Sequence, residues 1–251
     1  MKMIYALTVV AAATIACSNS TTDHQYTDQS QDGIAVVELF TSEGCSSCPP
    51  ADEAIINLAN EKRKHVFILA FHVDYWDALG WKDGFSSKSS TLRQQQYGNR
   101  FNLNSVYTPE IVVNGRTEFI GSDRKRLANA VGEELNNKID SRIEIKASSN
   151  NNKTVSVNYK IDSSTGQLIN FALLQSSALT DVKRGENKGR QLKHINIVRD
   201  FKTIEPAPSG IILLSLPDGL SAKDCNVIAY LQHKKDGQIV GAAETAIDGI
   251  K

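Results

Sequence analysis

Two cysteines separated by two serines are the residues with the clearest capacity for chemistry. The sequence CSSC spans residues 45–48, and two prolines follow it, which suit the first turn of a helix. Two thiols at this spacing can alternate between a disulfide and a dithiol, because the second thiol resolves a mixed disulfide formed on the first. Unpaired amides at a helix start favour a thiolate. We therefore predict a solvent-accessible redox pair, with Cys45 as the nucleophile and Cys48 as the more shielded resolving thiol.

The charges near the pair predict a less stable thiolate than that of a strong oxidant. Glu43 and Asp52 lie close in sequence, and no Lys, Arg or His stands between the two cysteines. Three other interpretations stay open. The cysteines could form a structural disulfide, as in many exported proteins, the fold could persist without activity, or two thiolates and an imidazole such as His72 could bind Cu(I). Because His72 lies in an apolar segment typical of a core strand, and no second C-x-x-C supports zinc, we assign no metal ligand and no cofactor.

The residues around the pair alternate between strand and helix patterns. Residues 34–40 and 65–73 are short, almost continuous apolar runs, typical of strands buried on both faces. Residues 51–59 repeat apolar side chains at helical spacing, and residues 90–101 are rich in helix-forming residues. Asn-Gly at residues 114–115 predicts a hairpin between two further strands, and an amphipathic helix follows it. The predicted order is β-α-β-α-β-β-α.

This order of elements is that of the thioredoxin fold, which also keeps its cysteine pair at the start of the first helix. Thioredoxin-like proteins place a cis-proline opposite the disulfide, immediately before the third strand. Thr108-Pro109 holds that place here, and a cis X-Pro bond costs only about 0.5–1 kcal/mol. Trp76 belongs to a polar and aromatic loop after the second strand, at the predicted rim of the site. Thr108, Pro109 and Trp76 are therefore the predicted substrate-binding residues.

The pattern changes to alternation of apolar and polar residues in the second half of the chain, where about seven short strands fit a small β-sandwich. The predicted fold class is therefore α/β, with a thioredoxin-like domain over residues 33–140 followed by a smaller all-β, sandwich-like domain over residues 141–251. The polar loop at residues 185–190 could contact a partner or the first domain, although a mobile connection between strands is the more common role of such a loop. We expect Cys225 to be buried as a small apolar residue.

The N-terminus is typical of an export signal. A positive residue precedes an apolar stretch at residues 4–15, which is too short to span a bilayer, and residues 14–17 resemble a bacterial lipobox. We predict that residues 1–17 are a lipoprotein signal peptide, that Cys17 carries the lipid, and that residues 18–32 are a flexible tether. An ordinary cleaved signal, leaving Cys17 as a free thiol, is the alternative. The predicted location is the periplasm or cell envelope, and the absence of an acidic residue after Cys17 is compatible with the outer membrane.

The composition indicates which classes of partner to expect. The chain has 28 basic and 28 acidic residues and no net charge, so nucleic acid is not an expected partner. The expected partners are exported proteins with thiols or disulfides, together with the membrane through the lipid anchor. We predict an exported thiol-disulfide oxidoreductase. The alternatives are an envelope protein-binding module with a structural disulfide and a copper-handling protein.

Four long motifs carry a resemblance to a known family. They are VVELFTSEGCSSCPPAD, FHVDYWDALGWKD, VYTPEIVVNG and GENKGRQLKHINIVRDF. With these motifs the chain resembles a family of secreted bacterial proteins known as domain of unknown function 1223. The resemblance implies a thioredoxin-like fold with a C-terminal β-rich extension, and the family pattern matches at Cys45, Cys48 and Pro109. It implies no settled activity or substrate, so the functional prediction rests on the chemistry of the cysteines.

Overall fold

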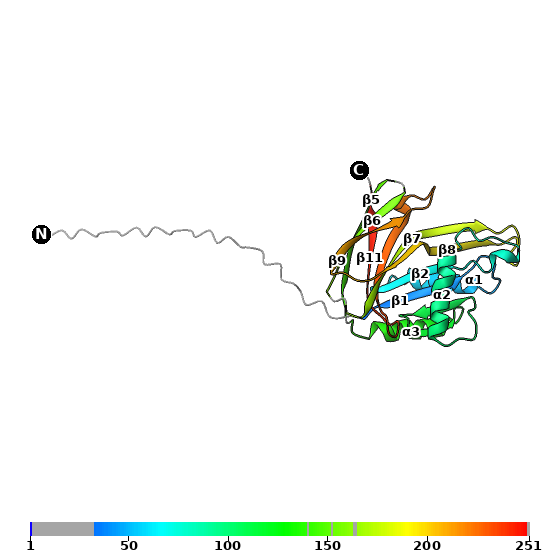
Figure 1. Cartoon of the computed structure of the whole chain (residues 1–251), viewed down its shortest axis with the longest axis horizontal. Coiled ribbons are helices and arrows are strands. Elements are labelled where there is room, and N and C mark those ends of the chain that lie inside the picture. The colour runs from blue at the N-terminus through cyan, green and yellow to red at the C-terminus, as the bar shows by residue number, and fades with distance from the viewer. Residues whose placement is uncertain (2–32, 140, 152, 163–164, 250–251) are drawn as a thin grey trace. The chain divides into compact units, whose positions relative to one another are not determined.

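The computed structural model describes residues 1, 33–139, 141–151, 153–162 and 165–249 (Figure 1). The predicted signal peptide beyond its first residue, the predicted tether and Cys17, the predicted site of lipid attachment, lie outside the described residues. From Gly33 onward the described residues belong to one compact unit. Within these residues, no helix has both the length and the apolar character needed to cross a bilayer.

Four strands from the first half of the chain lie at one end of the sheet: β1 (Ala35–Thr41), β2 (Val66–His72), β3 (Glu110–Val113) and β4 (Thr117–Ile120). β1 is buried along its whole length, pairs in parallel with β2 and pairs antiparallel with β3. Asn114 and Gly115 both adopt positive φ between β3 and β4, as the Asn-Gly hairpin signal predicts. The antiparallel pairing of β1 with β3 places the start of β3 beside the end of β1.

Three helices accompany these strands: α1 (Pro49–Asn60), α2 (Lys88–Arg100) and α3 (Arg124–Leu135). α1 begins directly after Cys48 and carries prolines at its first two positions, where a missing amide costs no intrahelical hydrogen bond. α2 begins at Ser87, whose hydroxyl accepts from the amide of Ser90. The apolar face of α1 packs against β1, β2 and β3, which fixes the helix start at the end of β1.

Seven more strands come from the second half of the chain. They are β5 (Ile143–Asn151), β6 (Thr154–Ile161), β7 (Gln167–Asp181), β8 (Gln191–Ile204), β9 (Ser209–Ser215), β10 (Cys225–His233) and β11 (Ile239–Asp248). Single turns of 3₁₀ helix lie at Asp77–Leu79 and Ala222–Asp224. Cys225 is buried in the apolar core formed by these strands, as predicted.

The predicted fold class is wrong, because the strands of both halves form one mixed sheet. Its eleven described strands follow the order β4-β3-β1-β2-β8-β7-β10-β11-β5-β6-β9, and Ala70 of β2 pairs with Ile197 of β8. The protein is mostly β, and a thioredoxin-like α/β domain followed by a separate all-β domain is not what the structure shows. The cause is the length of β7 and β8, which have 15 and 14 residues. Their polar middle and end segments have a loop-like composition, yet they pair with each other almost throughout.

A buried polar cluster joins α2 to both halves of the sheet. Arg93 donates through Nε and Nη2 to Glu38, through Nη1 to Gln232, and through Nη2 to the hydroxyls of Tyr97 and Tyr230. The two tyrosines in turn donate to Glu38. We call these five residues the core cluster. Since Glu38 lies on β1 and Tyr230 on β10, the cluster links the two ends of the chain through hydrogen bonds.

Candidate functional site

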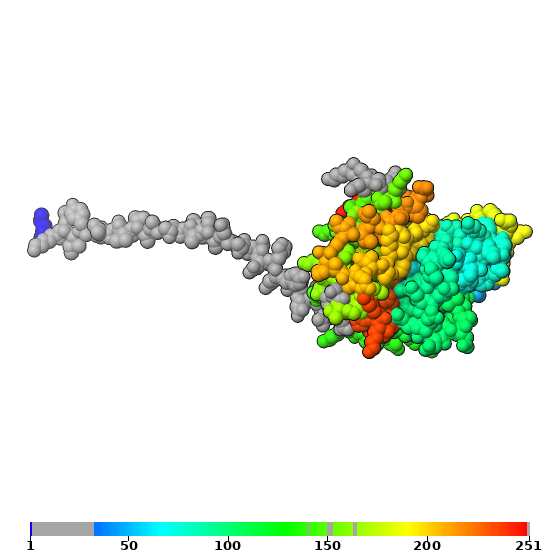
Figure 2. All heavy atoms as spheres, viewed as in Figure 1, coloured from blue at the N-terminus to red at the C-terminus, as the bar shows by residue number. Residues whose placement is uncertain are grey.

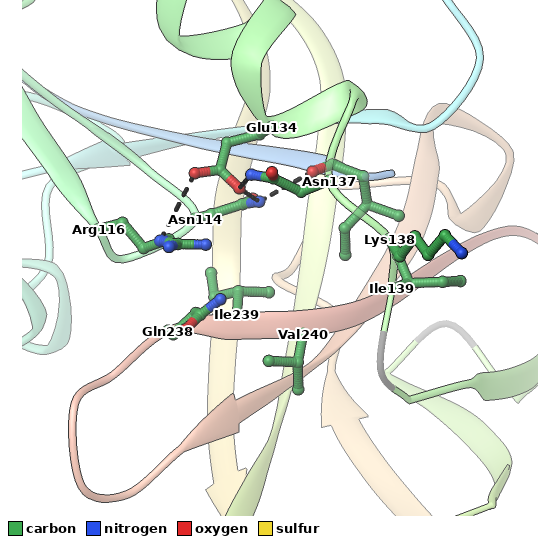
Figure 3. Close-up of a pocket in the computed structure, with 10 residues that line it drawn as sticks. Asn114, Arg116, Glu134, Asn137, Lys138, Ile139, Gln238, Ile239 and Val240 are labelled. Carbon is green, nitrogen blue, oxygen red and sulfur yellow. Dashed lines mark hydrogen bonds and ion pairs between the residues drawn. The ribbon is translucent and has the colours of Figure 1, made fainter. Parts of the chain in front are cut away.

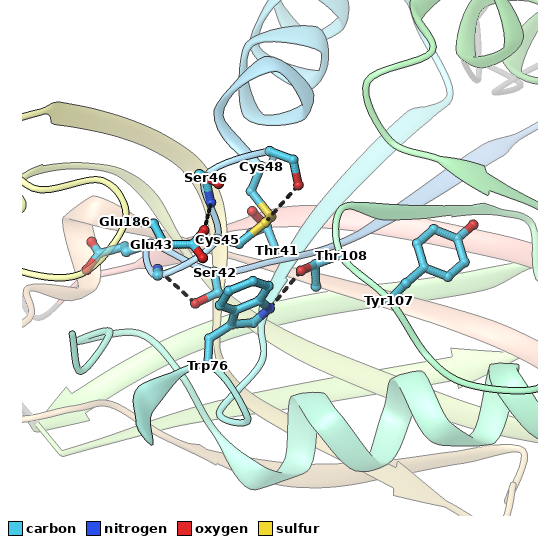
Figure 4. The surroundings of a disulfide bond; sticks show 12 residues. Thr41, Ser42, Glu43, Cys45, Ser46, Cys48, Trp76, Tyr107, Thr108 and Glu186 are labelled. Carbon is cyan, nitrogen blue, oxygen red and sulfur yellow. Dashed lines mark hydrogen bonds between the residues drawn. A yellow bond between two sulfur atoms is a disulfide. The ribbon is translucent and has the colours of Figure 1, made fainter. Parts of the chain in front are cut away.

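Cys45 and Cys48 form a disulfide in the turn that leads from β1 into α1 (Figure 4). The turn is held by its backbone, because the amide of Cys48 donates to the carbonyl of Cys45 and the amide of Ala51 donates to that of Cys48. Cys48 is the N-cap residue of α1. The two predicted catalytic residues are therefore bonded to each other at a helix start, where amides and the helix dipole favour negative charge on sulfur.

The predicted solvent accessibility of this pair is wrong. Both cysteines are 0% exposed, whereas Ser46 and Ser47 between them are exposed. The hydroxyl oxygen of Ser47 lies 3.4 Å from Sγ of Cys45. The sulfurs are therefore covered by other parts of the chain, and a partner can reach them only if one of these parts moves.

The loop between β7 and β8 closes over the cysteine turn. We call residues 182–190 the clamp loop. Asn187 is fully buried, and its side-chain amide donates to the carbonyls of Glu43 and Cys45, each at 2.9 Å. Glu186 accepts from the amide of Ser46 at 3.1 Å (Figure 4). Three hydrogen bonds thus hold this loop against the disulfide turn, so the predicted alternative, contact with the first half of the chain, is confirmed.

Trp81 provides a second fixed point for the clamp loop. A Cβ placed on Gly185 would lie 3.0 Å from Cβ of Trp81, so the backbone of the loop packs closely against this residue. Gly185 also has φ of 74°, a value that L side chains rarely adopt. In the space-filling view the yellow tip of the β7–β8 hairpin accordingly lies against the cyan segment that follows β2 (Figure 2).

The predicted substrate-binding residues meet beside the disulfide turn. The Nε1–H of Trp76 donates to Oγ1 of Thr108 at 2.8 Å, and Cβ of Trp76 lies 3.2 Å from where a side chain on Gly44 would begin. The Thr108-Pro109 peptide bond is cis. Gly121 allows Pro109 to approach the first turn of α1, because a Cβ on Gly121 would lie about equally close to Pro109 and to α1. Trp76 thus bridges the cysteine turn and the cis-proline.

Behind the disulfide, a histidine from β8 lies between two carboxylates that flank the cysteines in sequence. Nδ1 of His194 is 3.2 Å from Oδ1 of Asp52, and Nε2 is 3.6 Å from Oε1 of Glu43. All three side chains are buried. Burial alone would lower the pKa of His194, but hydrogen bonding and charge attraction to the two carboxylates outweigh it and raise this pKa to about 10. His194 is therefore an imidazolium at neutral pH.

A second histidine–carboxylate pair adjoins the first. Nδ1 of His72 lies 2.7 Å from Oδ2 of Asp83, and the rings of His72 and His194 meet edge to face. Burial alone would raise the pKa of Asp83. Charge attraction to His72 and the hydrogen bond with it outweigh burial and lower this pKa to about 2. The same carboxylate accepts from the amide of Glu43, which ties this pair to the cysteine turn. We call Glu43, Asp52, His72, Asp83 and His194 the disulfide cluster.

The disulfide cluster is incompletely hydrogen-bonded. Nε2 of His72 is buried without a hydrogen-bond partner among the described residues, and Oε1 of Glu43 and Nε2 of His194 meet only as an ion pair at 3.6 Å. Unsatisfied buried polar atoms are rare in folded proteins and mark sites of strain or chemistry. The expected negative charge of Glu43 and Asp52 beside the cysteines is thus present, but a buried cation compensates for it.

Sequence reasoning missed the half of this site that comes from β7 and β8. Asn187 and His194 lie more than one hundred residues after the cysteines, so no local spacing connects them. Two signals pointed to this segment: the concentration of polar residues at 185–194 and its place within one of the four family motifs. His72 agrees with the interpretation as a core histidine, since it is buried and engaged by Asp83. Among the described residues, no three His, Cys, Asp or Glu side chains are arranged to hold a metal ion.

A second pocket lies away from the cysteines, between α3 and the start of β11 (Figure 3). Its volume is about 230 Å³. Glu134 accepts from the side-chain amides of Asn114 and Asn137 and pairs with Arg116 at 3.7 Å. Asn114 also accepts from the amide of Val36. These groups satisfy one another and fix the β3–β4 hairpin to α3, which is a structural role.

Comparison with known proteins agrees with the motifs. Residues 36–232 match the family described as protein of unknown function DUF1223. The chain belongs to this family. The crystal structure of protein AGR_C_4864 from Agrobacterium tumefaciens is similar at 29% identity and a TM-score of 0.65, covering 85% of this chain and 94% of that one. A domain of the outer membrane lipoprotein Omp28 from Porphyromonas gingivalis aligns at 12% identity with a TM-score of 0.28, covering 45% of this chain and 92% of that one. No curated protein matches the chain.

Proposed function

We propose that this protein is an exported thiol-disulfide oxidoreductase that uses the Cys45–Cys48 couple. One observation carries the proposal: the disulfide lies at the start of α1 and adjoins a buried, incompletely hydrogen-bonded set of ionisable side chains. A disulfide that only staples a fold needs no such neighbours. A disulfide that gains and loses two electrons does, because each thiol must exchange a proton when its sulfur is released.

The reaction proceeds through a mixed disulfide. A partner thiolate attacks Sγ of Cys45, the bond between Cys45 and Cys48 breaks, and its electron pair leaves with Sγ of Cys48, which takes up a proton. A second partner thiolate then attacks the partner's own sulfur and releases Cys45 as a thiolate. The partner leaves with a disulfide, and two electrons remain on the cysteine pair. The reverse sequence reduces a partner disulfide.

The surroundings of the pair favour Cys45 as the sulfur that is attacked. Its neighbour Ser46 is exposed, and the Ser47 hydroxyl lies within reach of its sulfur and can donate to a thiolate there. Cys48 is held by α1 on the inner side of the turn. Since both sulfurs are buried, attack requires the clamp loop to release the turn, and this loop is therefore part of the proposed mechanism.

The proposal is tested by trapping and by potentiometry. Cys48→Ala should hold partner proteins on Cys45 as mixed disulfides, and the wild-type couple should equilibrate reversibly with a defined glutathione or dithiothreitol buffer. Cys225→Ala is the matched control, because Cys225 is a buried free cysteine whose pKa is raised by burial to about 11. Failure to trap any partner, together with failure to reduce a small-molecule disulfide, would refute the activity.

The complete burial of both sulfurs favours a second candidate function, an envelope protein-binding module with a structural disulfide. In this case the double variant Cys45→Ser, Cys48→Ser would lose stability, about 2–4 kcal/mol for a typical disulfide, while partner binding survives. In an oxidoreductase the same variant loses all exchange activity. Measuring both quantities on one variant separates the two functions.

We further propose that the chain is exported and anchored through Cys17. The support is the apolar N-terminal stretch that ends at a lipobox-like sequence. Expression in a Gram-negative host followed by fractionation should place the protein with membranes, and Cys17→Ala should move it to the soluble periplasmic fraction. Recovery of the unprocessed chain in the cytoplasm would refute export.

A further inference from the structure

A groove of about 510 Å³ lies beside the disulfide, between α1 and the first residues of β8. One wall is formed by the first two turns of α1, which begin directly after Cys48, and the other by the start of β8. The β7–β8 hairpin reaches α1 because Ile195 packs on the same apolar core as this helix. The groove therefore begins next to the cysteine turn and has the size of a ligand-binding cleft.

The wall formed by β8 presents an open strand edge. The amide of Val182 donates to the carbonyl of Arg190 at 2.9 Å, which identifies these two residues as a hydrogen-bonded pair of the hairpin. Bonded and non-bonded pairs alternate along antiparallel strands. Hence the backbone groups of Gln191 and Lys193 point away from β7. Within the described residues, the far edge of β8 pairs with another strand only at Ile197.

Four charged residues line the groove: Arg190 and Lys193 on the side of β8, and Asp52 and Glu53 on the side of α1. Residues 181–193 contain five Lys or Arg and two Asp or Glu, although the whole chain has no net charge. Lys193 is exposed, and its ammonium has no ion pair among the described side chains. The acidic residues of the opposite wall are already engaged, because Glu53 pairs with Arg124 at 2.6 Å and Asp52 pairs with His194. The groove therefore favours a negatively charged occupant.

We propose that this groove binds an extended, acidic segment of a partner polypeptide as an added strand against residues 191–193 of β8. Backbone hydrogen bonds to Gln191 and Lys193 give affinity independent of sequence, and the basic side chains select acidic residues. The inference rests on the proposed function for its purpose, since a segment bound here leads its neighbouring cysteine to the turn at Cys45. The substrate class is thus a protein thiol or disulfide flanked by acidic residues in extended chain.

Binding without exchange tests the inference. The probe is a fluorescently labelled peptide of alternating valine and glutamate with serine in place of the reactive cysteine, titrated against the mature chain by anisotropy. The double variant Arg190→Glu, Lys193→Glu should weaken binding at least about tenfold, whereas Lys223→Glu, Lys235→Glu, an equal charge change at two exposed sites outside the groove, should have little effect. A peptide with lysine in place of glutamate should not bind.

Methylation of backbone amides identifies the mode of binding. Peptides N-methylated at every second residue, in the two possible registers, should differ strongly in affinity, because only one edge of the added strand faces β8. Equal affinity of the two methylated peptides, or undiminished binding by the double variant, overturns the proposal. The oxidoreductase activity is measured separately by trapping on Cys48→Ala, so a protein that binds the peptide but traps no partner on Cys45 refutes the redox function alone.

Discussion

Two buried clusters of charged residues differ in how completely they are hydrogen-bonded. In the core cluster, each of the three guanidinium nitrogens of Arg93 donates to a partner, and both oxygens of Glu38 accept. In the disulfide cluster, as far as the structure describes its surroundings, one nitrogen of His72 has no hydrogen bond, and Glu43 and His194 meet only as an ion pair at 3.6 Å. A cluster whose polar atoms are all hydrogen-bonded has one low-energy arrangement and holds its helices and strands together. A cluster in which some polar atoms lack hydrogen bonds can still take up a proton or form a new hydrogen bond. This suits a site whose neighbouring sulfurs alternate between disulfide and thiol.

The largest effect on stability is expected from a substitution in the core cluster. Arg93→Met leaves the Glu38 carboxylate buried without its cation, which should lower the free energy of unfolding by about 3–5 kcal/mol in urea titrations. Lys234→Met, which breaks an exposed ion pair with Glu205, should cost less than about 1 kcal/mol. Similar losses in the two variants would contradict the comparison. Arg93→Lys provides a folded intermediate case if the Met variant does not accumulate.

The next largest effect on stability is expected from substitution of His194, and its size depends on pH. Its folded pKa of about 10 exceeds the unfolded value of about 6.5, so the stabilisation by its charge is complete below about pH 6.5 and is lost as pH rises through 10. His194→Gln should therefore cost about 2–4 kcal/mol at pH 6 and much less at pH 10. It should also make the Cys45–Cys48 couple harder to reduce, because a cation that favours thiolates is lost.

His65→Asn is the control for this pH dependence, since His65 is exposed and asparagine tolerates its positive φ. The control should change neither the pH dependence of stability nor the reduction potential. A pH-independent loss in His194→Gln would mean that the imidazole contributes packing alone.

A smaller effect on stability is expected in the clamp loop, with a clear effect on access. Asn187→Ala removes both hydrogen bonds to the cysteine turn and should cost about 1–2 kcal/mol. Reduction of the disulfide by a small thiol should become several-fold faster, because the covered sulfurs are exposed more often. Lys188→Ala, at an exposed position of the same loop, should leave the rate unchanged. An unchanged rate in Asn187→Ala would show that the loop does not control access.

The smallest effect is expected at Glu110, which follows the cis-proline. Burial raises the pKa of Glu110 to about 7, above its ordinary value of about 4.5. The folded protein therefore holds this proton more tightly, and stability falls as pH rises from about 4.5 through 7. Glu110→Gln should be more stable than wild type by about 1 kcal/mol at pH 8 and equal to it at pH 4, in parallel urea titrations. A difference of the same size at both pH values would contradict this assignment.

The features predicted correctly from the sequence are those with local causes. The disulfide, the helix that starts after Cys48 and the turn at Asn114 follow from spacing, prolines and backbone preference. The cis bond at Pro109 is confirmed too, but it was expected by analogy with thioredoxin-like proteins and not from a local cause. The fold class failed because apolar pattern cannot show that the polar parts of β7 and β8 pair, nor that β8 then joins β2. The predicted accessibility of the two cysteines was wrong for the same reason, because the loop that covers them connects β7 to β8.

The contribution of the β7–β8 hairpin to the site has a consequence for biosynthesis. Both cysteines leave the ribosome well before Asn187 and His194 exist, so a nascent chain exposes the two thiols without the clamp loop or the imidazolium. An oxidant can therefore react with an uncovered dithiol during synthesis, whereas in the folded protein it encounters a disulfide that the clamp loop covers. A chain truncated before β7 would carry the reactive sulfurs without the parts that control them, and its thiols should react with any disulfide in reach.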